Sequence, residues 1–176
     1  MDIVRELMNF NSFWTIWFWL AHVVAWSMAS HFTLGVPFDM VVEANREKEE
    51  GGPYARATDA MIQAQIFRFT TLFRRYGMLL SGSTAFLIAV LLTLGTLGDS
   101  EFARAMLSIM IPLTLIYIFT IRFAIRMERE GLSGATLRKA LGKQRLINQL
   151  FGLLGISMAV LLAMYQVIIN FESFLY

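Results

Sequence analysis

Residues 77–98 read GMLLSGSTAFLIAVLLTLGTLG and contain no charged side chain. A helix rises 1.5 Å per residue, so a stretch of this length can cross a hydrocarbon core about 30 Å thick. Because lipid offers no partner for an open backbone, the stretch is expected to be an α-helix. The sequence therefore predicts a transmembrane helix here.

Three further stretches meet the same criterion. One lies in a run of 32 residues, from Leu7 to Phe38, without Asp, Glu, Lys or Arg. Another is shorter, since 17 residues separate Arg104 from Arg122, and we expect these two arginines to reach toward opposite headgroups. The four predicted spans are residues 13–36, 77–98, 102–125 and 146–170.

Small residues repeat every four positions in three of these spans. Such ladders let helix backbones approach closely in lipid, so they predict a compact bundle. The ladders are Ala21, Ala25 and Ala29; Gly77, Ser81, Ala85 and Ala89; and Gly155, Ala159 and Ala163.

The composition agrees with one all-α membrane domain covering residues 1–176, a four-transmembrane-helix bundle. Hydrophobic residues make up 57% of the chain and charged residues 16%, against about 25% charged in soluble proteins. The mean hydropathy is +0.58. Cysteine is absent, which excludes disulfides and thiolate ligation of iron–sulfur clusters. A net charge of +2 without a basic and aromatic pattern argues against nucleic acid as a partner.

The basic residues predict an orientation. Thirteen of the fifteen Lys and Arg residues fall within residues 37–76 and 122–145, and cytoplasmic loops carry the basic excess. We therefore expect cytoplasmic loops at about 37–76 and 126–145, with both termini on the outer side. The start, MDIVRELMN, has no basic leader region, so we expect the first span to remain in the mature protein.

A helical face precedes the second span. Ile62, Ile66, Phe69 and Phe73 recur at helical spacing within residues 58–76. The segment is either an extension of the second span or an amphipathic helix that precedes it and contacts lipid or a partner. These four residues are the first group of candidate contact residues.

The second group lies in a short basic helix predicted within residues 131–145. Leu137 and Leu141 share one side of it. Such a helix ordinarily lies on anionic headgroups, and a docking surface for a soluble partner is the alternative. The candidate contact residues here are Arg138, Lys139, Lys143 and Arg145.

The two histidines both lie in the first hydrophobic stretch. His22 and His31 are nine residues apart, about 900° around a helix, so they lie on opposite faces and cannot share a ligand. His22 is a candidate axial ligand for haem or a pigment. The alternative is a neutral histidine that is hydrogen-bonded to a carbonyl or to a hydroxyl of a neighbouring helix. For His31 we expect a hydrogen bond to Asp39 or a headgroup.

Signatures of other chemistry are missing from the sequence. There is no nucleophile elbow, no phosphate-binding loop and no cluster of His with acidic residues, so we expect no enzyme activity and no metal site. The predicted spans hold no carboxylate of the kind that transporters place at mid-membrane. A small transporter or channel would need an oligomeric pore lined by Ser81, Ser83, Thr84 or the amides of the fourth span.

One resemblance covers most of the chain. The strings WSMASHFTLGVPFDM (Trp26 to Met40), REGLSGATLRKAL and MYQ resemble a family of small four-span inner-membrane proteins of alphaproteobacteria, commonly labelled a component of the SufBCD complex. The resemblance implies a bacterial inner membrane, periplasmic termini and a link to iron–sulfur cluster assembly. Since the chain has no thiolate, that link would be an anchoring one.

We therefore expect a non-enzymatic accessory or anchoring subunit of a larger membrane complex, with the bilayer and other protein subunits as partners and no cofactor of its own. One alternative is an accessory subunit of a respiratory or photosynthetic complex that contacts haem, pigment or quinone through His22. The other is the oligomeric transporter or channel. Homo-oligomerisation stays open.

Overall fold

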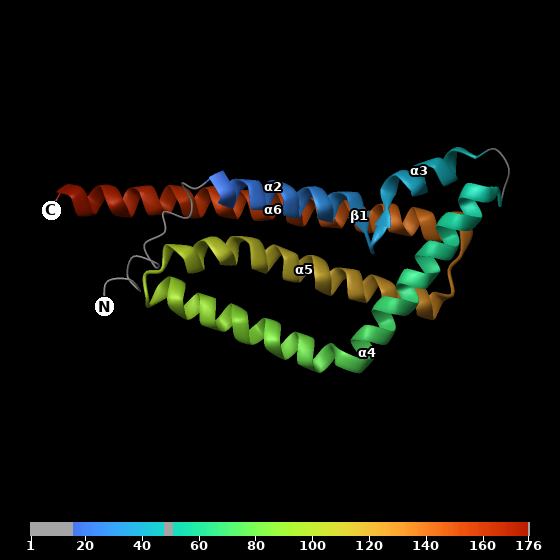
Figure 1. Ribbon diagram of the computed structural model, residues 1–176, viewed down its shortest axis with the longest axis horizontal. Helices are drawn as coiled ribbons and strands as arrows, with labels where there is room; N and C mark the ends of the chain where they lie inside the picture. The colour runs from blue at the N-terminus through green and yellow to red at the C-terminus, as the bar shows by residue number, and fades with distance from the viewer. Residues whose placement is uncertain (1–15, 48–50, 176) are drawn as a thin grey trace.

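A computed structural model of the protein describes residues 16–47 and 51–175, with side chains described up to residue 168. This part of the chain is almost entirely helical, with one short β-hairpin (Figure 1). In chain order the elements are α2 (Ile16–His31), β1 (Phe32–Thr33), β2 (Val36–Pro37), α3 (Phe38–Arg46), α4 (Pro53–Thr96), α5 (Glu101–Glu130) and α6 (Gly134–Leu175).

The long helices lie side by side over much of their length. α5 packs between α4 and α6, and α2 lies along α6 (Figure 1). Among the described residues, α4, α5 and α6 are long and apolar enough to cross a membrane. This confirms an all-α fold of membrane-protein character. The predicted bundle of four spans is matched in part, because α2 has 16 described residues and residues 13–15 of the first predicted span lie outside the described chain.

The first predicted span ends earlier than expected. α2 stops at His31, and the chain turns through Leu34 and Gly35, whose φ angles are 56° and 73°. Two successive residues with positive φ cannot continue a right-handed helix, and they suit the tight turn of a β-hairpin. Leu34 is 2% exposed, and burial of its side chain offsets the strain of its backbone.

The segments predicted as cytoplasmic loops are largely helical, and the helix predicted within residues 58–76 is an extension of the second predicted span. α4 is one unbroken helix, of which we call residues 53–76 the head arm and residues 77–96 the membrane arm. It changes direction partway along its length (Figure 1). Pro53 occupies the first turn, where its missing N–H costs nothing. The Glu47 carboxylate accepts hydrogen bonds from the backbone N–H groups of Tyr54 and Ala55, at 3.0 and 2.8 Å.

The connection between α5 and α6 is also shorter than predicted. α5 continues to Glu130, and Gly131, with a φ of 59°, ends it in the left-handed conformation that glycine favours. α6 begins at Gly134. The predicted short basic helix is therefore the first part of α6.

The hairpin, α3, the head arm and the adjoining ends of α5 and α6 form a head at one end of the molecule (Figure 1). They surround a hydrophobic cluster, the head core, drawn from all of these elements. Its buried members are Leu34, Val36, Val41, Ile62, Ile66, Ala124, Met127, Leu137 and Leu141.

Outside the head the helices pack unevenly, so the predicted compact bundle is wrong for α4. In their most apolar stretches, 6% of the residues of α4 are buried, compared with 33% in α5 and 22% in α6. Ser81, Ala85 and Ala89 of the predicted small-residue ladder are exposed. In α6, by contrast, Gly155 and Ala159 are buried, because α2 and α5 cover that helix.

The contact between α2 and α6 depends on one glycine. A Cβ atom at Gly155 would lie 2.4 Å from a ring carbon of Trp26, whereas one at Gly152 would come no closer than 3.7 Å to that ring. Trp26 is 7% exposed and has little room to shift. We expect Gly155→Ala to destabilise the protein by about 2 kcal/mol through overpacking, and Gly152→Ala to be tolerated. Thermal unfolding in detergent measures both, and equal midpoints would contradict the packing described.

Candidate functional site

His22 is enclosed by its own helix and by α5. Its side chain is 2% exposed and lies against the rings of Phe18 and Trp26, with centroids 4.4 and 6.1 Å away. Nδ1 lies 3.2 Å from the Phe18 carbonyl oxygen, and Nε2 lies 3.4 Å from the Ser108 hydroxyl. These are the partners expected for a neutral histidine that is not a metal ligand, namely a backbone carbonyl and a hydroxyl of a neighbouring helix. A haem iron or pigment metal would have to displace one of these partners.

We expect His22→Ala to lower the stability of the protein by about 2 kcal/mol, because it removes a buried ring and opens a cavity between α2 and α5. The visible absorption of the purified protein should not change. Thermal unfolding in detergent and an absorption spectrum test the two statements. A visible band that His22→Ala removes would instead establish His22 as a ligand.

His31 lies near the surface at the end of α2. Its ring is exposed and packs edge-on against Phe32, with centroids 4.8 Å apart. Among the described residues it forms no hydrogen bond with Asp39, so that expectation is wrong, and the headgroup alternative remains a prediction.

The first group of candidate contact residues proves to be mainly core. Ile62 is 0% and Ile66 3% exposed, both within the head core, and Phe69 packs against it partly buried. The shared helical face is confirmed, but for these residues its role as an exposed contact face is corrected. β2, α5 and the start of α6 already cover it. Phe73 lies farther along and lines a groove described below.

The second group divides in two. The Arg138 side chain is 10% exposed, and Arg145 donates from Nε to the Ser30 carbonyl at 3.2 Å and stacks over the Phe38 ring. Both arginines therefore bind other parts of this chain, which corrects their assignment as free contact residues. Lys139 and Lys143 are exposed, so their predicted role remains open.

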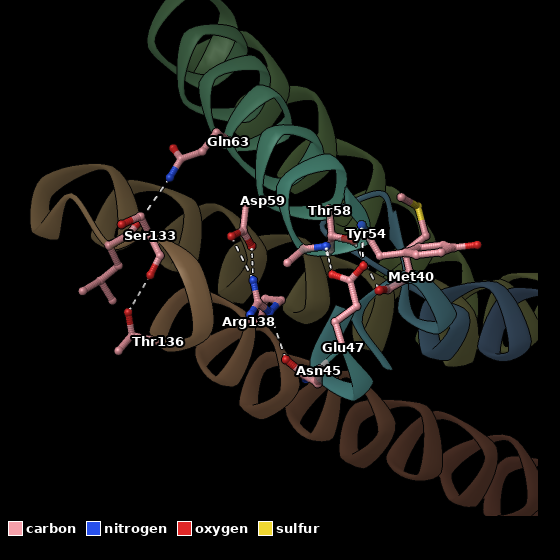
Figure 2. A network of polar contacts seen from close by, with 12 residues as sticks. Met40, Asn45, Glu47, Tyr54, Thr58, Asp59, Gln63, Ser133, Thr136 and Arg138 are labelled. Carbon is pink, nitrogen blue, oxygen red and sulfur yellow. Dashed lines mark hydrogen bonds and ion pairs between the residues drawn. The ribbon is translucent and has the colours of Figure 1, made fainter. Parts of the chain in front are cut away.

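A polar network joins the elements of the head (Figure 2). The Arg138 guanidinium donates through one nitrogen to both carboxylate oxygens of Asp59, at 2.8 and 2.9 Å, and through Nε to Asn45 Oδ1 at 2.9 Å. Gln63 donates to the Leu132 carbonyl at 2.9 Å. These bonds fix α3, α4 and the α5–α6 connection to α6, so the head is a single packed unit.

Amides of α6 hold the end of α2. Asn148 donates to the Ala29 carbonyl at 3.3 Å, and Gln149 to the Ser30 hydroxyl at 3.2 Å. The last carbonyls of a helix have no partner within it, and Asn148 supplies one for the Ala29 carbonyl. Inter-helix hydrogen bonds therefore account for these two amides. Asn170 lies outside the described side chains.

Arg104 plays a similar part at the opposite end of the molecule. Its guanidinium donates to the Gly95 carbonyl at the end of α4 and to Gln166 Oε1 of α6, both at 2.9 Å. Its side chain is 12% exposed. Arg104 therefore ties α4 and α6 to α5 instead of pointing freely toward headgroups.

The sequence did not predict a groove between α4 and α5. It has a volume of about 500 Å³, and apolar side chains such as Phe73, Ile88 and Ile121 form much of its lining. Four side chains with hydroxyl groups also line it, namely Ser81, Thr84, Thr114 and Tyr117. The Tyr117 hydroxyl is buried and has no hydrogen-bond partner among the described residues. Ser81 and Thr84, two hydroxyl side chains within the uncharged second span, were the signal available in the sequence.

Among the residues that the structure describes, no group of three His, Cys, Asp or Glu side chains could hold a metal ion. Comparisons with protein-family models, curated proteins and solved structures find no match to this chain.

Proposed function

We propose that this protein is a non-enzymatic accessory subunit of a membrane complex, and that the groove between α4 and α5 receives a transmembrane helix of a partner subunit. The observation that carries the proposal is the membrane arm of α4. It packs on α5 along one side and leaves Ser81 and Ala85 of the groove lining exposed.

The lining of the groove suits a helix better than acyl chains alone. In lipid, helices associate through small residues and through hydrogen bonds of hydroxyl side chains. Ser81, Thr84 and Ala85 on α4 supply small residues, two of which also carry hydroxyl groups. An acyl chain offers no hydrogen-bond partner, whereas a partner helix can bring one.

The proposed topology has α2 as a fourth span, with the head in the cytoplasm of a bacterium and both termini in the periplasm. Two observations support it. The segments that carry thirteen of the fifteen basic residues gather at the head end, as the positive-inside rule requires. α2 runs along α6 with exposed apolar side chains such as Ile16 and Trp17, which suits a lipid surface.

The proposed link to iron–sulfur cluster assembly is an anchoring one. It rests on the resemblance of the sequence, and the absence of cysteine removes cluster ligation by this chain's own thiolates. The head would then be the part that faces soluble assembly proteins.

Site-specific photo-crosslinking in native membranes tests the proposal. A photoreactive amino acid at Ser81 or Thr84 should give one discrete adduct, which mass spectrometry identifies as another membrane protein. The same amino acid at Phe86, which is 67% exposed and outside the groove lining, is the matched control and should give mainly lipid adducts. Lipid adducts alone from Ser81 and Thr84 would contradict the proposal, and adducts of two copies of this chain would replace it with a homo-oligomer.

A further inference from the structure

A second groove lies between α5 and α6 at the head end. Its volume is about 690 Å³, and two helical stripes face each other across it. On α5 the stripe includes Arg122 and Arg126, and on α6 it includes Lys139 and Lys143. Four cationic side chains therefore line one groove.

These charges are poorly neutralised within the chain. The carboxylate in the groove lining belongs to Glu130, and it pairs with Arg126 at 3.1 Å. No described carboxylate lies within ion-pair distance of Arg122, Lys139 or Lys143. Within each helix the cations are four residues apart, a spacing at which like charges repel. A bound anion would relieve repulsion both within and between the helices.

The position of the groove along α5 and α6 indicates the kind of anion. Arg122 is the first charged residue after the apolar interval 105–121 of α5, and no charged residue occurs in residues 146–168 of α6. The cations thus stand at the border of the apolar segments, where lipid headgroups lie. Apolar side chains continue the lining toward the membrane, among them Phe119 and Ile147. The groove is thus cationic at the head and apolar toward the membrane, which matches a ligand that joins an anionic group to a hydrocarbon chain.

We propose that the groove between α5 and α6 is a binding site for an anionic phospholipid. Its phosphate lies among Arg122, Lys139 and Lys143, and its glycerol and first methylenes pack on Phe119 and Ile147. Basic pockets between transmembrane helices at the cytoplasmic surface bind such headgroups in general. The site is distinct from the groove proposed for the partner subunit, because α6 forms one of its walls and Lys139 and Lys143 line this groove alone, whereas Arg122 lies at the edge of both.

Native mass spectrometry of the full chain in detergent tests this site with three added lipids, which are cardiolipin, phosphatidylglycerol and zwitterionic phosphatidylethanolamine. The groove variant combines Arg122→Gln, Lys139→Gln and Lys143→Gln. The control variant combines Arg56→Gln, Arg68→Gln and Arg75→Gln, three exposed arginines of the head arm, and so changes the net charge equally. All six side chains are exposed, and circular dichroism confirms that both variants are folded.

The wild-type protein and the control variant should each retain one anionic phospholipid, and the groove variant should bind it at least tenfold more weakly. Phosphatidylethanolamine should bind all three equally weakly. Equal loss in the control variant would overturn the proposal in favour of diffuse surface charge. Full displacement of the lipid by inorganic phosphate would overturn it in favour of a site for a soluble anion.

Discussion

Replacement of Ile62 by alanine is expected to lower the free energy of unfolding of the head by about 3 kcal/mol. The side chain is 0% exposed in the head core, so truncation removes buried methyl groups and leaves a cavity. Hydrogen exchange of the amides in the head arm measures the effect, since about 3 kcal/mol corresponds to roughly a hundredfold loss of protection where exchange requires opening of the head.

Phe67→Ala is the matched control for this experiment. Phe67 lies on the same arm of α4 and is 67% exposed, so its truncation should change protection by less than about 0.5 kcal/mol. The comparison separates the two interpretations of the apolar face. If Ile62→Ala left protection unchanged but abolished binding of a partner, Ile62 would be a docking residue after all.

Arg138→Ala should destabilise the head by a similar amount, about 3 kcal/mol. It removes three hydrogen bonds at 2.8–2.9 Å and leaves Asp59 and Asn45 without their partner (Figure 2). Asp59 is 24% exposed, and loss of one partner from a largely buried pair costs more than the pair itself contributes. Protection of the head arm and of the first turns of α6 should fall together.

The neighbouring Lys139→Ala serves as the control, because Lys139 is exposed and should shift protection by less than about 0.5 kcal/mol. The double variant Asp59→Ala with Arg138→Ala should be less destabilised than the sum of the two single changes, since it removes both charges. Strict additivity would show that the two side chains do not interact.

The sequence predicted the helices of this protein better than the surfaces that cover them. The prediction from hydropathy agrees with α5 to within five residues at each end, whereas α6 begins 12 residues before the predicted span. Long uncharged stretches in lipid favour a helix over any other backbone structure. The periodicity of Ile62 and Ile66 located a helical face correctly. It carries no information on whether that face meets lipid, another protein or the rest of the chain, and here the head core covers it.

The starts of helices and the positions of turns were harder to predict from the sequence. Pro53 falls inside the loop predicted at residues 37–76, yet it begins a helix of 44 residues, because proline suits the first turn. The hairpin after α2 depends on a positive φ at Leu34. Leucine rarely adopts this conformation, so the residue type does not predict the turn. The sequence predicted a carbonyl or a hydroxyl of a neighbouring helix as the partner of His22. It did not identify Ser108, which lies 86 positions away along the chain, because a single sequence does not reveal such a pairing.

A single helix, α4, belongs both to the head and to the apolar part of the molecule. It runs from Pro53 to Thr96 and changes direction between its two arms (Figure 1), so the membrane arm and the head arm are joined through the backbone of one helix. Ile62 and Asp59 hold the head arm against α6. A displacement of the membrane arm would therefore act on the head first through the contacts of Ile62 and Asp59.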